Sequence, residues 1–176
     1  MPRKVLPGRV GAAAPDGAVE TLASEGHRVV VSDLYAMGFK AVADAFPGTD
    51  QGNFARYREA GAQMALGNAK EAAAAYQQVI GAAGDSIYGQ MAKLGLAETQ
   101  ARSGEFDKAI ETFKAMSTNK DGTLPVDGIL MQLARTYREA GKGSDAEQTL
   151  NRVVSEFPDS QFAAEAKKEL DAIKKG

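Results

Sequence analysis

The sequence contains no cysteine and no tryptophan, and its only histidine is His27. Without cysteine there can be no disulfide bond, thiolate metal site or cysteine nucleophile, and one histidine excludes a site built from several histidine ligands. His27 lies in a short connector, and the sequence suggests no acid–nucleophile pair to go with it. We therefore predict no catalytic residue, no bound metal and no cofactor.

A surplus of positive charge is also missing, because 21 Lys and Arg stand against 23 Asp and Glu, giving a net charge of −2. Since nothing compensates the charge of a phosphate backbone, we expect no nucleic-acid binding. No apolar run reaches the roughly 18 residues that a membrane span needs. The basic start lacks the apolar stretch of a signal peptide, so we expect a cytoplasmic chain if Met1 is the true start.

The main positive feature is an internal repeat with a period of 37 residues. Three glycines that each follow a helical pattern, Gly67, Gly104 and Gly141, are separated by this period. Repeats of this length indicate stacked supersecondary units. Four further columns share the spacing: Ala60, Ala97 and Ala134; Ala72, Ala109 and Ala146; Tyr76, Phe113 and Leu150; and Val79, Met116 and Val153.

Each repeat is predicted to form two antiparallel helices. In the middle repeat, apolar residues at helical spacing predict a helix over Ser86–Arg102 and another over Glu105–Met116, with Gly104 in the turn between them. Small residues mark where the two helices cross closely, and the aromatic column fills the space between successive pairs. One such hairpin cannot bury its apolar face alone, so we expect neighbouring hairpins to stack.

The register extends beyond the three repeats. Pro47 and Pro158 are 111 residues apart, three periods, and Phe39 falls in the aromatic column. An apolar stripe with a broad polar face predicts a solvating helix at the C-terminal end. We therefore divide residues 33–176 into a leading half-repeat (33–47), three repeats (about 52–84, 86–121 and 125–158) and a capping helix (160–175).

The pattern Gly-x-x-x-x-Ala-x-x-x-aromatic-x-x-apolar, with Ala seven residues before Gly and Pro after the second helix, resembles the tetratricopeptide repeat over residues 33–175. That resemblance implies an all-α, right-handed solenoid and a non-catalytic scaffold that binds a protein or peptide. The endings Phe46–Thr49 and Phe157–Ser160 are similar to a subgroup common in bacterial cell-envelope proteins. This implies envelope assembly or secretion as the setting, and the periplasm as the compartment.

The family resemblance also implies a ligand groove. In tetratricopeptide repeats, positions ten and six residues before the turn glycine face the concave surface, and an apolar column there suits a peptide anchored by apolar side chains. Leu94 and Glu98 stand where the carboxylate clamp of some members would need cationic or amide residues, so we expect no binding of a C-terminal carboxylate by that mode. A plain alternative is that these residues only pack against the cap or the N-terminal segment. The predicted groove residues are Tyr57, Leu94 and Met131 in the first column, Gly61, Glu98 and Arg135 in the second, and Arg58, Met64, Gln132 and Arg138 as neighbours.

Residues 1–32 depart from the repeat. The pattern predicts a helix from about Asp16 to Glu25 and a short strand over Val29–Val31. Residues 16–40 resemble flavodoxin-like NAD(P)H quinone reductases, but 6–15 lack the His and Ser-Phe-Asn that contribute to flavin binding in that family. We interpret 1–32 as an irregular, fragment-like segment. Two alternatives stay open, a piece of a flavin-dependent quinone oxidoreductase and a module that self-associates through its unpaired strand.

Overall fold

The computed structural model describes residues 31–119 and 122–173, with side chains described from Ala36 onward. It divides the chain into Met1–Val31 and Ser32–Gly176. The predicted helix at 16–25 and residues 29–30 of the predicted strand lie outside the described residues. The strand prediction is wrong at Val31, which is the first residue of a helix. Ala36 and Ala43, seven residues or about two helical turns apart, are buried on one face of this helix.

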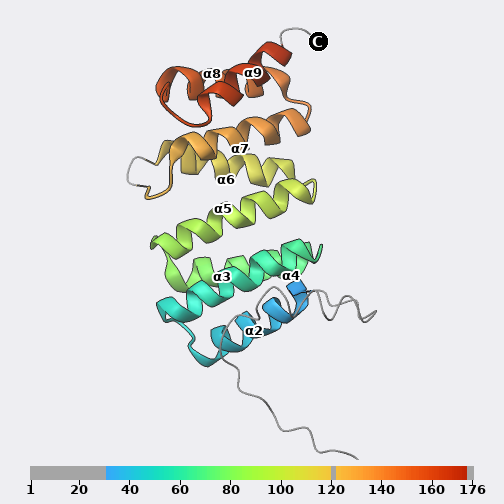
Figure 1. Ribbon diagram of the computed structural model, residues 1–176, viewed down its shortest axis with the longest axis vertical. Coiled ribbons are helices and arrows are strands. Elements are labelled where there is room, and N and C mark those ends of the chain that lie inside the picture. Colours follow the sequence, from blue (N-terminus) through green and yellow to red (C-terminus); the bar gives the residue numbers. More distant parts are fainter. Residues whose placement is uncertain (1–30, 120–121, 174–176) are drawn as a thin grey trace, which may run out of the picture. The chain divides into compact units, whose positions relative to one another are not determined.

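The described residues contain eight helices and no strand. They are α2 (Val31–Ala45), α3 (Asp50–Ala65), α4 (Ala69–Ala83), α5 (Ile87–Arg102), α6 (Phe106–Thr118), α7 (Val126–Glu139), α8 (Gly143–Glu156) and α9 (Ala163–Ile173). Within Ser32–Gly176 the hairpins α3–α4, α5–α6 and α7–α8 follow one another in a stack that α9 ends (Figure 1). The predicted all-α solenoid, with its leading half-repeat helix and its cap, is confirmed.

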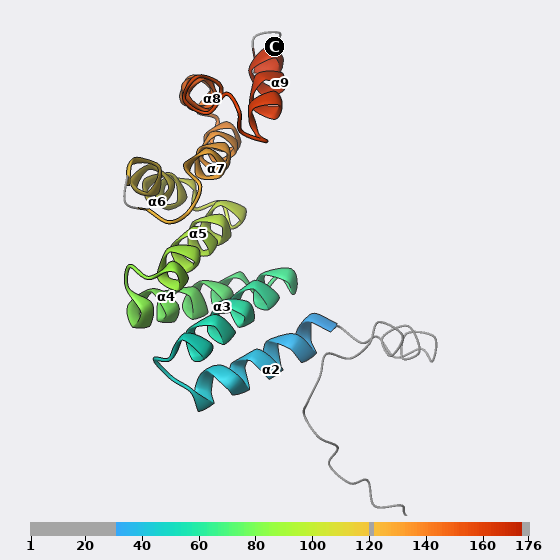
Figure 2. The ribbon, with the colours of Figure 1, turned by 60° about the vertical axis from the view of Figure 1, so that its left-hand side comes forward.

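The hairpins place their helices in two layers. Figure 2 shows α4, α6 and α8 on one side of the stack and α3, α5, α7 and α9 on the other. Here the surface formed by α3, α5, α7 and α9 is called the A face. It corresponds to the surface that the sequence assigns to a ligand groove.

The turns explain why glycine recurs at the 37-residue spacing. Gly67, Gly104 and Gly141 have φ values of 83°, 79° and 73°, in the left-handed region that other residues seldom adopt. Each one lets the chain reverse immediately after a helix of the A face. The turn predicted from these glycines is therefore present in all three hairpins.

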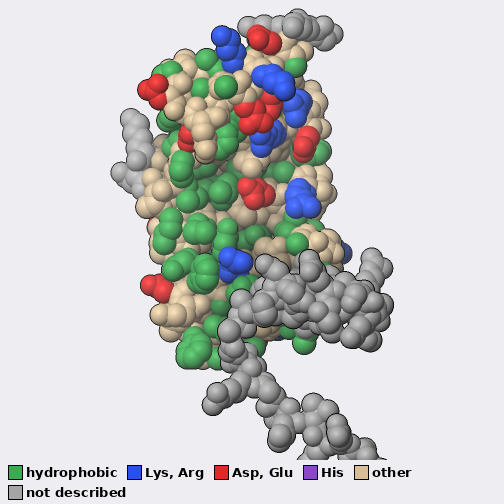
Figure 3. All heavy atoms as spheres, viewed as in Figure 1, with side chains coloured by type: hydrophobic (Ala, Val, Ile, Leu, Met, Phe, Trp, Pro, Cys, Tyr) green, Lys and Arg blue, Asp and Glu red, His purple; other side chains and the backbone are tan. Residues whose placement is uncertain are grey.

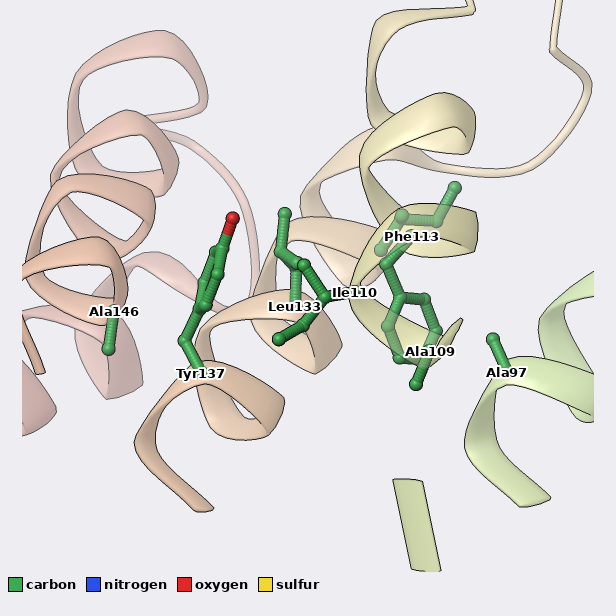
Figure 4. Packing of buried hydrophobic residues seen from close by; sticks show 8 residues of the cluster. Ala97, Ala109, Ile110, Phe113, Leu133, Tyr137 and Ala146 are labelled. Atoms are coloured by element: carbon green, nitrogen blue, oxygen red, sulfur yellow. The ribbon is translucent and has the colours of Figure 1, made fainter. Parts of the chain in front are cut away.

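The core is built from the predicted columns. Both alanine columns are buried, and so are Tyr76, Phe113 and Leu150 of the aromatic column. Figure 4 shows how α6 contributes Ala109, Ile110 and Phe113 to a cluster that also contains Ala97 of α5 and Leu133 and Tyr137 of α7. Because each cluster draws on neighbouring hairpins, every repeat depends on the next for burial of its apolar surface.

A second periodic signal marks the beginnings of the A-face helices. Hydroxyl residues recur 37 apart at Thr49, Ser86, Thr123 and Ser160. The side chains of Thr49 and Ser86 accept hydrogen bonds from the Gly52 and Gly89 amides, as N-caps do. Ser160 accepts from the Phe162 amide, and α9 begins at Ala163, slightly later than the predicted start at Ser160.

Thr123 departs from this pattern. The α6–α7 connection runs from Asn119 to Pro125, whereas the α4–α5 connection runs only from Gly84 to Ser86. Thr123 does not cap α7; its backbone amide instead donates to Gln90 Oε1 on α5, at 3.0 Å. The longer connection lays Leu124 and Pro125 along the edge of the A face, where they contribute to the site described below.

Candidate functional site

The A face carries a cleft of about 410 Å³ between α5 and α7, closed at one side by the segment that precedes α9. In Figure 3, which views the same side as Figure 1, hydrophobic side chains cover much of this face and charged side chains gather toward α7–α9. The lining residues are Leu94 and Glu98 of α5, Leu124 and Pro125 of the connection, Asp127, Gly128, Ile129, Met131, Gln132 and Arg135 of α7, and Gln161 and Phe162.

The apolar wall of the cleft comes from three separate segments. Leu94 is a half-buried residue of α5, Leu124 comes from the α6–α7 connection, and Phe162 precedes α9. Phe162 lies beside α7 at Gly128, where a Cβ would make an ordinary contact with the Phe162 ring at 3.4 Å. Sequence reasoning placed Phe162 in the cap and did not assign Leu124 to the site, because their meeting depends on the longer connection.

Met131 does not project as an accessible anchor, contrary to the role predicted for the first column. Only 1% of its surface is exposed, and it belongs to the core cluster that joins α7, α8 and α9. The physical reason is the cap, because α9 and the preceding Phe162 pack beside α7 and cover the side chain. Met131 therefore lies in the floor of the cleft, beneath the residues that an incoming ligand could contact.

Two polar side chains of the second column and its neighbours meet inside the cleft. The Gln132 side-chain amide donates to Glu98 Oε1 at 3.3 Å, which links α5 to α7. Burial disfavours the charged carboxylate and raises the pKa of Glu98, while the positive charge of Arg102 acts in the opposite direction. The cleft thus combines apolar walls with a partly desolvated carboxylate.

The arginines predicted for the groove are occupied by the capping helix. Arg135 lies 2.8 Å from Glu165 and 3.7 Å from Glu169, and Arg138 lies 3.0 Å from Glu169. These pairs are partly exposed, so each contributes little to stability, but together they neutralise this end of the A face. Arg135 still lines the cleft, whereas Arg138 is not among its lining residues.

The predicted residues of α3 lie apart from the cleft lining. The ring of Tyr57 packs against Tyr76, with ring centroids 5.7 Å apart. Met64 packs against the core cluster that contains Tyr76. The Arg58 guanidinium lies 5.3 Å from the ring centre of Phe39 on α2 and 6.0 Å from that of Phe54. Gly61 is exposed on α3. The structure thus gathers Leu94, Glu98, Met131, Gln132 and Arg135 in one cleft and leaves Tyr57, Arg58, Gly61, Met64 and Arg138 outside its lining.

A second hollow, of about 470 Å³, contains none of the predicted site residues. Its lining includes Ile80 of α4, Leu96 of α5 and Met116 of α6. A 2.9 Å ion pair joins Lys93 and Asp85 among its polar residues. Of its charged lining residues, Lys93 and Asp85 neutralise each other, and Glu111 is exposed on α6.

The part of the chain that the structure describes contains neither a metal-binding cluster nor a membrane-spanning helix. Residues 31–119 and 122–173 hold no group of three or more His, Asp or Glu placed to bind a metal ion. Over the same ranges, no helix combines the length and apolar character that crossing a membrane requires. The one histidine, His27, lies outside the described residues.

Comparison with known proteins shows which families and solved structures this chain resembles. Residues 32–125 match the family described as tetratricopeptide repeat-like domain, and residues 129–160 match the tetratricopeptide repeat. No curated protein matches the chain. Among solved structures, a putative kinesin light chain from Podosopora anserina with nearly identical TPR-like repeats has 16% identity and a TM-score of 0.71, covering 90% of this chain and 83% of that one. A variant of that protein with a single substitution has 18% identity and the same TM-score, covering 90% and 82%. The chain belongs to the tetratricopeptide repeat-like family.

Proposed function

We propose that this chain is a non-catalytic scaffold that binds a protein or peptide segment in the cleft on the A face. Tetratricopeptide repeats generally bind protein partners, and their fold is typically a scaffold rather than an enzyme. The observation that supports this site is the combination of apolar walls, from Leu94, Leu124 and Phe162, with the polar pair Glu98 and Gln132. Apolar surface with a few placed polar groups suits a segment held by apolar anchors and oriented by hydrogen bonds.

The proposal extends to the cellular setting. The endings at Phe46–Thr49 and Phe157–Ser160 resemble those of bacterial cell-envelope repeats, and they support a role in envelope assembly or secretion. In that setting, the segment bound in the cleft would belong to a protein that is being assembled or secreted.

The experiment is a selection of random dodecapeptides displayed on phage against the immobilised full chain. We expect enrichment of peptides with two or more large apolar residues. These peptides should lose binding to Leu94→Ser and keep it with Ala74→Ser, which changes an exposed residue of α4. Circular dichroism must show that both variants remain helical. Should Leu94→Ser unfold, Leu124→Ser in the connection tests the same wall.

Two results would contradict the proposal. One is a failure of any peptide to enrich over an empty support. The other is equal binding of the selected peptides to wild type, Leu94→Ser and Leu124→Ser, which would place recognition elsewhere. A yellow protein with flavin absorbance after purification would instead favour the quinone-reductase alternative.

A further inference from the structure

Glu98 lines the cleft without an ion-pair partner, unlike Glu165 and Glu169 of α9. Among the described residues, no Lys or Arg nitrogen forms an ion pair with it, and its one side-chain hydrogen bond is the 3.3 Å bond from Gln132. Arg102, four residues further along α5, acts on it only through its charge. Glu165 and Glu169 both pair with Arg135. A half-buried carboxylate with one long hydrogen bond retains most of its capacity to accept others.

Two other carboxylates of the A face that are shielded from water have either more hydrogen-bond partners than Glu98 or a charged partner. Asp127, which also lines the cleft, accepts hydrogen bonds from the Gly128 amide and the Ser160 hydroxyl. Glu59, a buried carboxylate of α3, pairs with Arg56 at 3.1 Å. The fold thus supplies partners for its other half-buried carboxylates of α3 and α7, while Glu98 stays incompletely satisfied.

The surroundings make this unsatisfied charge costly. Leu94 lies one helical turn before Glu98 on the same face of α5, and Met131 and Phe162 line the same cleft. Burial raises the pKa of Glu98, because water solvates the buried carboxylate incompletely. A ligand group that brought a positive charge to this point would recover part of that cost.

We infer that the segment bound by the cleft carries a lysine or arginine beside its apolar anchor, and that this cation pairs with Glu98 while the apolar side chain packs on Leu94. The inference rests on the proposed function and adds the chemistry of the ligand. Charge complementarity selects this occupant, since the arginines at the edge of the cleft are already neutralised by α9.

The distance between Leu94 and Glu98 on α5 determines how far apart the apolar and basic residues of the ligand should be. Residues four apart on a helix have their Cβ atoms about 6 Å apart. A helical ligand matches this with its basic and apolar residues three or four positions apart. An extended ligand matches it with two residues on one face, about 6.6 Å apart at positions i and i+2.

The test uses the same dodecapeptide selection and then two synthetic peptides. We expect wild type to enrich sequences in which Lys or Arg stands two to four positions from Leu, Ile, Phe or Met. The strongest sequence is synthesised with its basic residue and with norleucine in its place, and both are measured by fluorescence anisotropy. Glu98→Gln should weaken the basic peptide about tenfold, as expected for a lost charged hydrogen bond. The norleucine peptide should change less than about twofold.

The matched control is Glu71→Gln, which removes the same charge from an exposed glutamate of α4 that takes part in no ion pair among the described residues. It should leave both affinities unchanged at equal ionic strength. Apolar peptides without basic enrichment, or equal weakening by Glu71→Gln and Glu98→Gln, would overturn the role of Glu98 while leaving the groove function standing. Failure of any peptide to enrich would overturn the groove function itself.

Discussion

The backbone of Gly95 on α5 lies directly against the ring of Tyr76 on α4. A Cβ built at residue 95 would approach Tyr76 Cζ to 2.5 Å, closer than side chains tolerate. The Tyr76 ring is buried and packs on Tyr57, so it has little room to withdraw. This contact sets how closely the first hairpin approaches the second.

Gly95→Ala should therefore destabilise the protein by about 1–3 kcal/mol through overpacking, despite the better helix propensity of alanine. The measurement is urea unfolding followed by circular dichroism. Gly61→Ala is the matched control, because a Cβ at residue 61 would lie 3.9 Å from the Tyr76 hydroxyl, an ordinary contact. It should be neutral or stabilising by up to about 1 kcal/mol. Equal effects of the two changes would show that the Gly95 contact is not tight.

The alanine columns give a second prediction. Ala109 is fully buried in the cluster between α5, α6 and α7, so Ala109→Leu should lower the free energy of unfolding by about 1–3 kcal/mol. Ala115→Leu, on the exposed side of the same helix, should change it by less than about 0.5 kcal/mol. Thermal melting of both variants checks this, and a tolerant Ala109 would contradict the close crossing of the helices.

The tyrosines predict a distinct alkaline titration. Burial raises the pKa of Tyr76 to about 12, with smaller contributions from Tyr57 and Glu98. The folded protein therefore keeps this proton above pH 10, where the unfolded chain loses it, and stability should fall as the pH rises from 10 to 12. Absorbance at the phenolate band should show Tyr76 ionising near pH 12, later than an exposed tyrosine. Tyr76→Phe should remove that step.

The pKa of Glu98 predicts a second pH dependence. Because the folded state raises it, the folded protein binds a proton at Glu98 more readily than the unfolded chain does. Above the folded-state pKa of Glu98, the buried carboxylate lowers the free energy of unfolding by its full amount. This loss disappears as the pH falls below the pKa that Glu98 has in the unfolded chain. Glu98→Gln should thus be at least as stable as wild type at pH 7, and its advantage should shrink toward pH 4 in parallel urea titrations. An advantage that grew on acidification would contradict the desolvation.

Much of the fold could be predicted because the same residue pattern occurs in each repeat. The spacing of Gly67, Gly104 and Gly141 identified the turns, and the small residues at Ala97 and Ala109 identified where helices cross. Each observation depends on local backbone geometry or on packing within one hairpin, so one-dimensional periodicity is sufficient to find it.

The site was less predictable because its geometry depends on contacts that break the period. Burial of Met131 and pairing of Arg135 follow from the cap, whose position the repeat pattern does not define. Leu124 reaches the cleft because the connection before α7 is longer than its counterpart before α5. The 37-residue period shows which residues lie on the A face. The cap and the longer connection before α7 determine which of these residues a ligand can reach.

The central claim, that the ligand lies in the cleft between α5 and α7, is tested most directly by methyl NMR of the methionines. The chain has six, and among them Met131 lines this cleft. Met116 lines the neighbouring hollow, which shares only Leu124 and Ile129 with the cleft. Single substitutions to leucine assign the two signals in protein labelled with ¹³C at the methionine methyl. Titration with the selected basic peptide should shift the Met131 signal and leave Met116 unchanged. A shift at Met116 with Met131 unmoved would contradict the account.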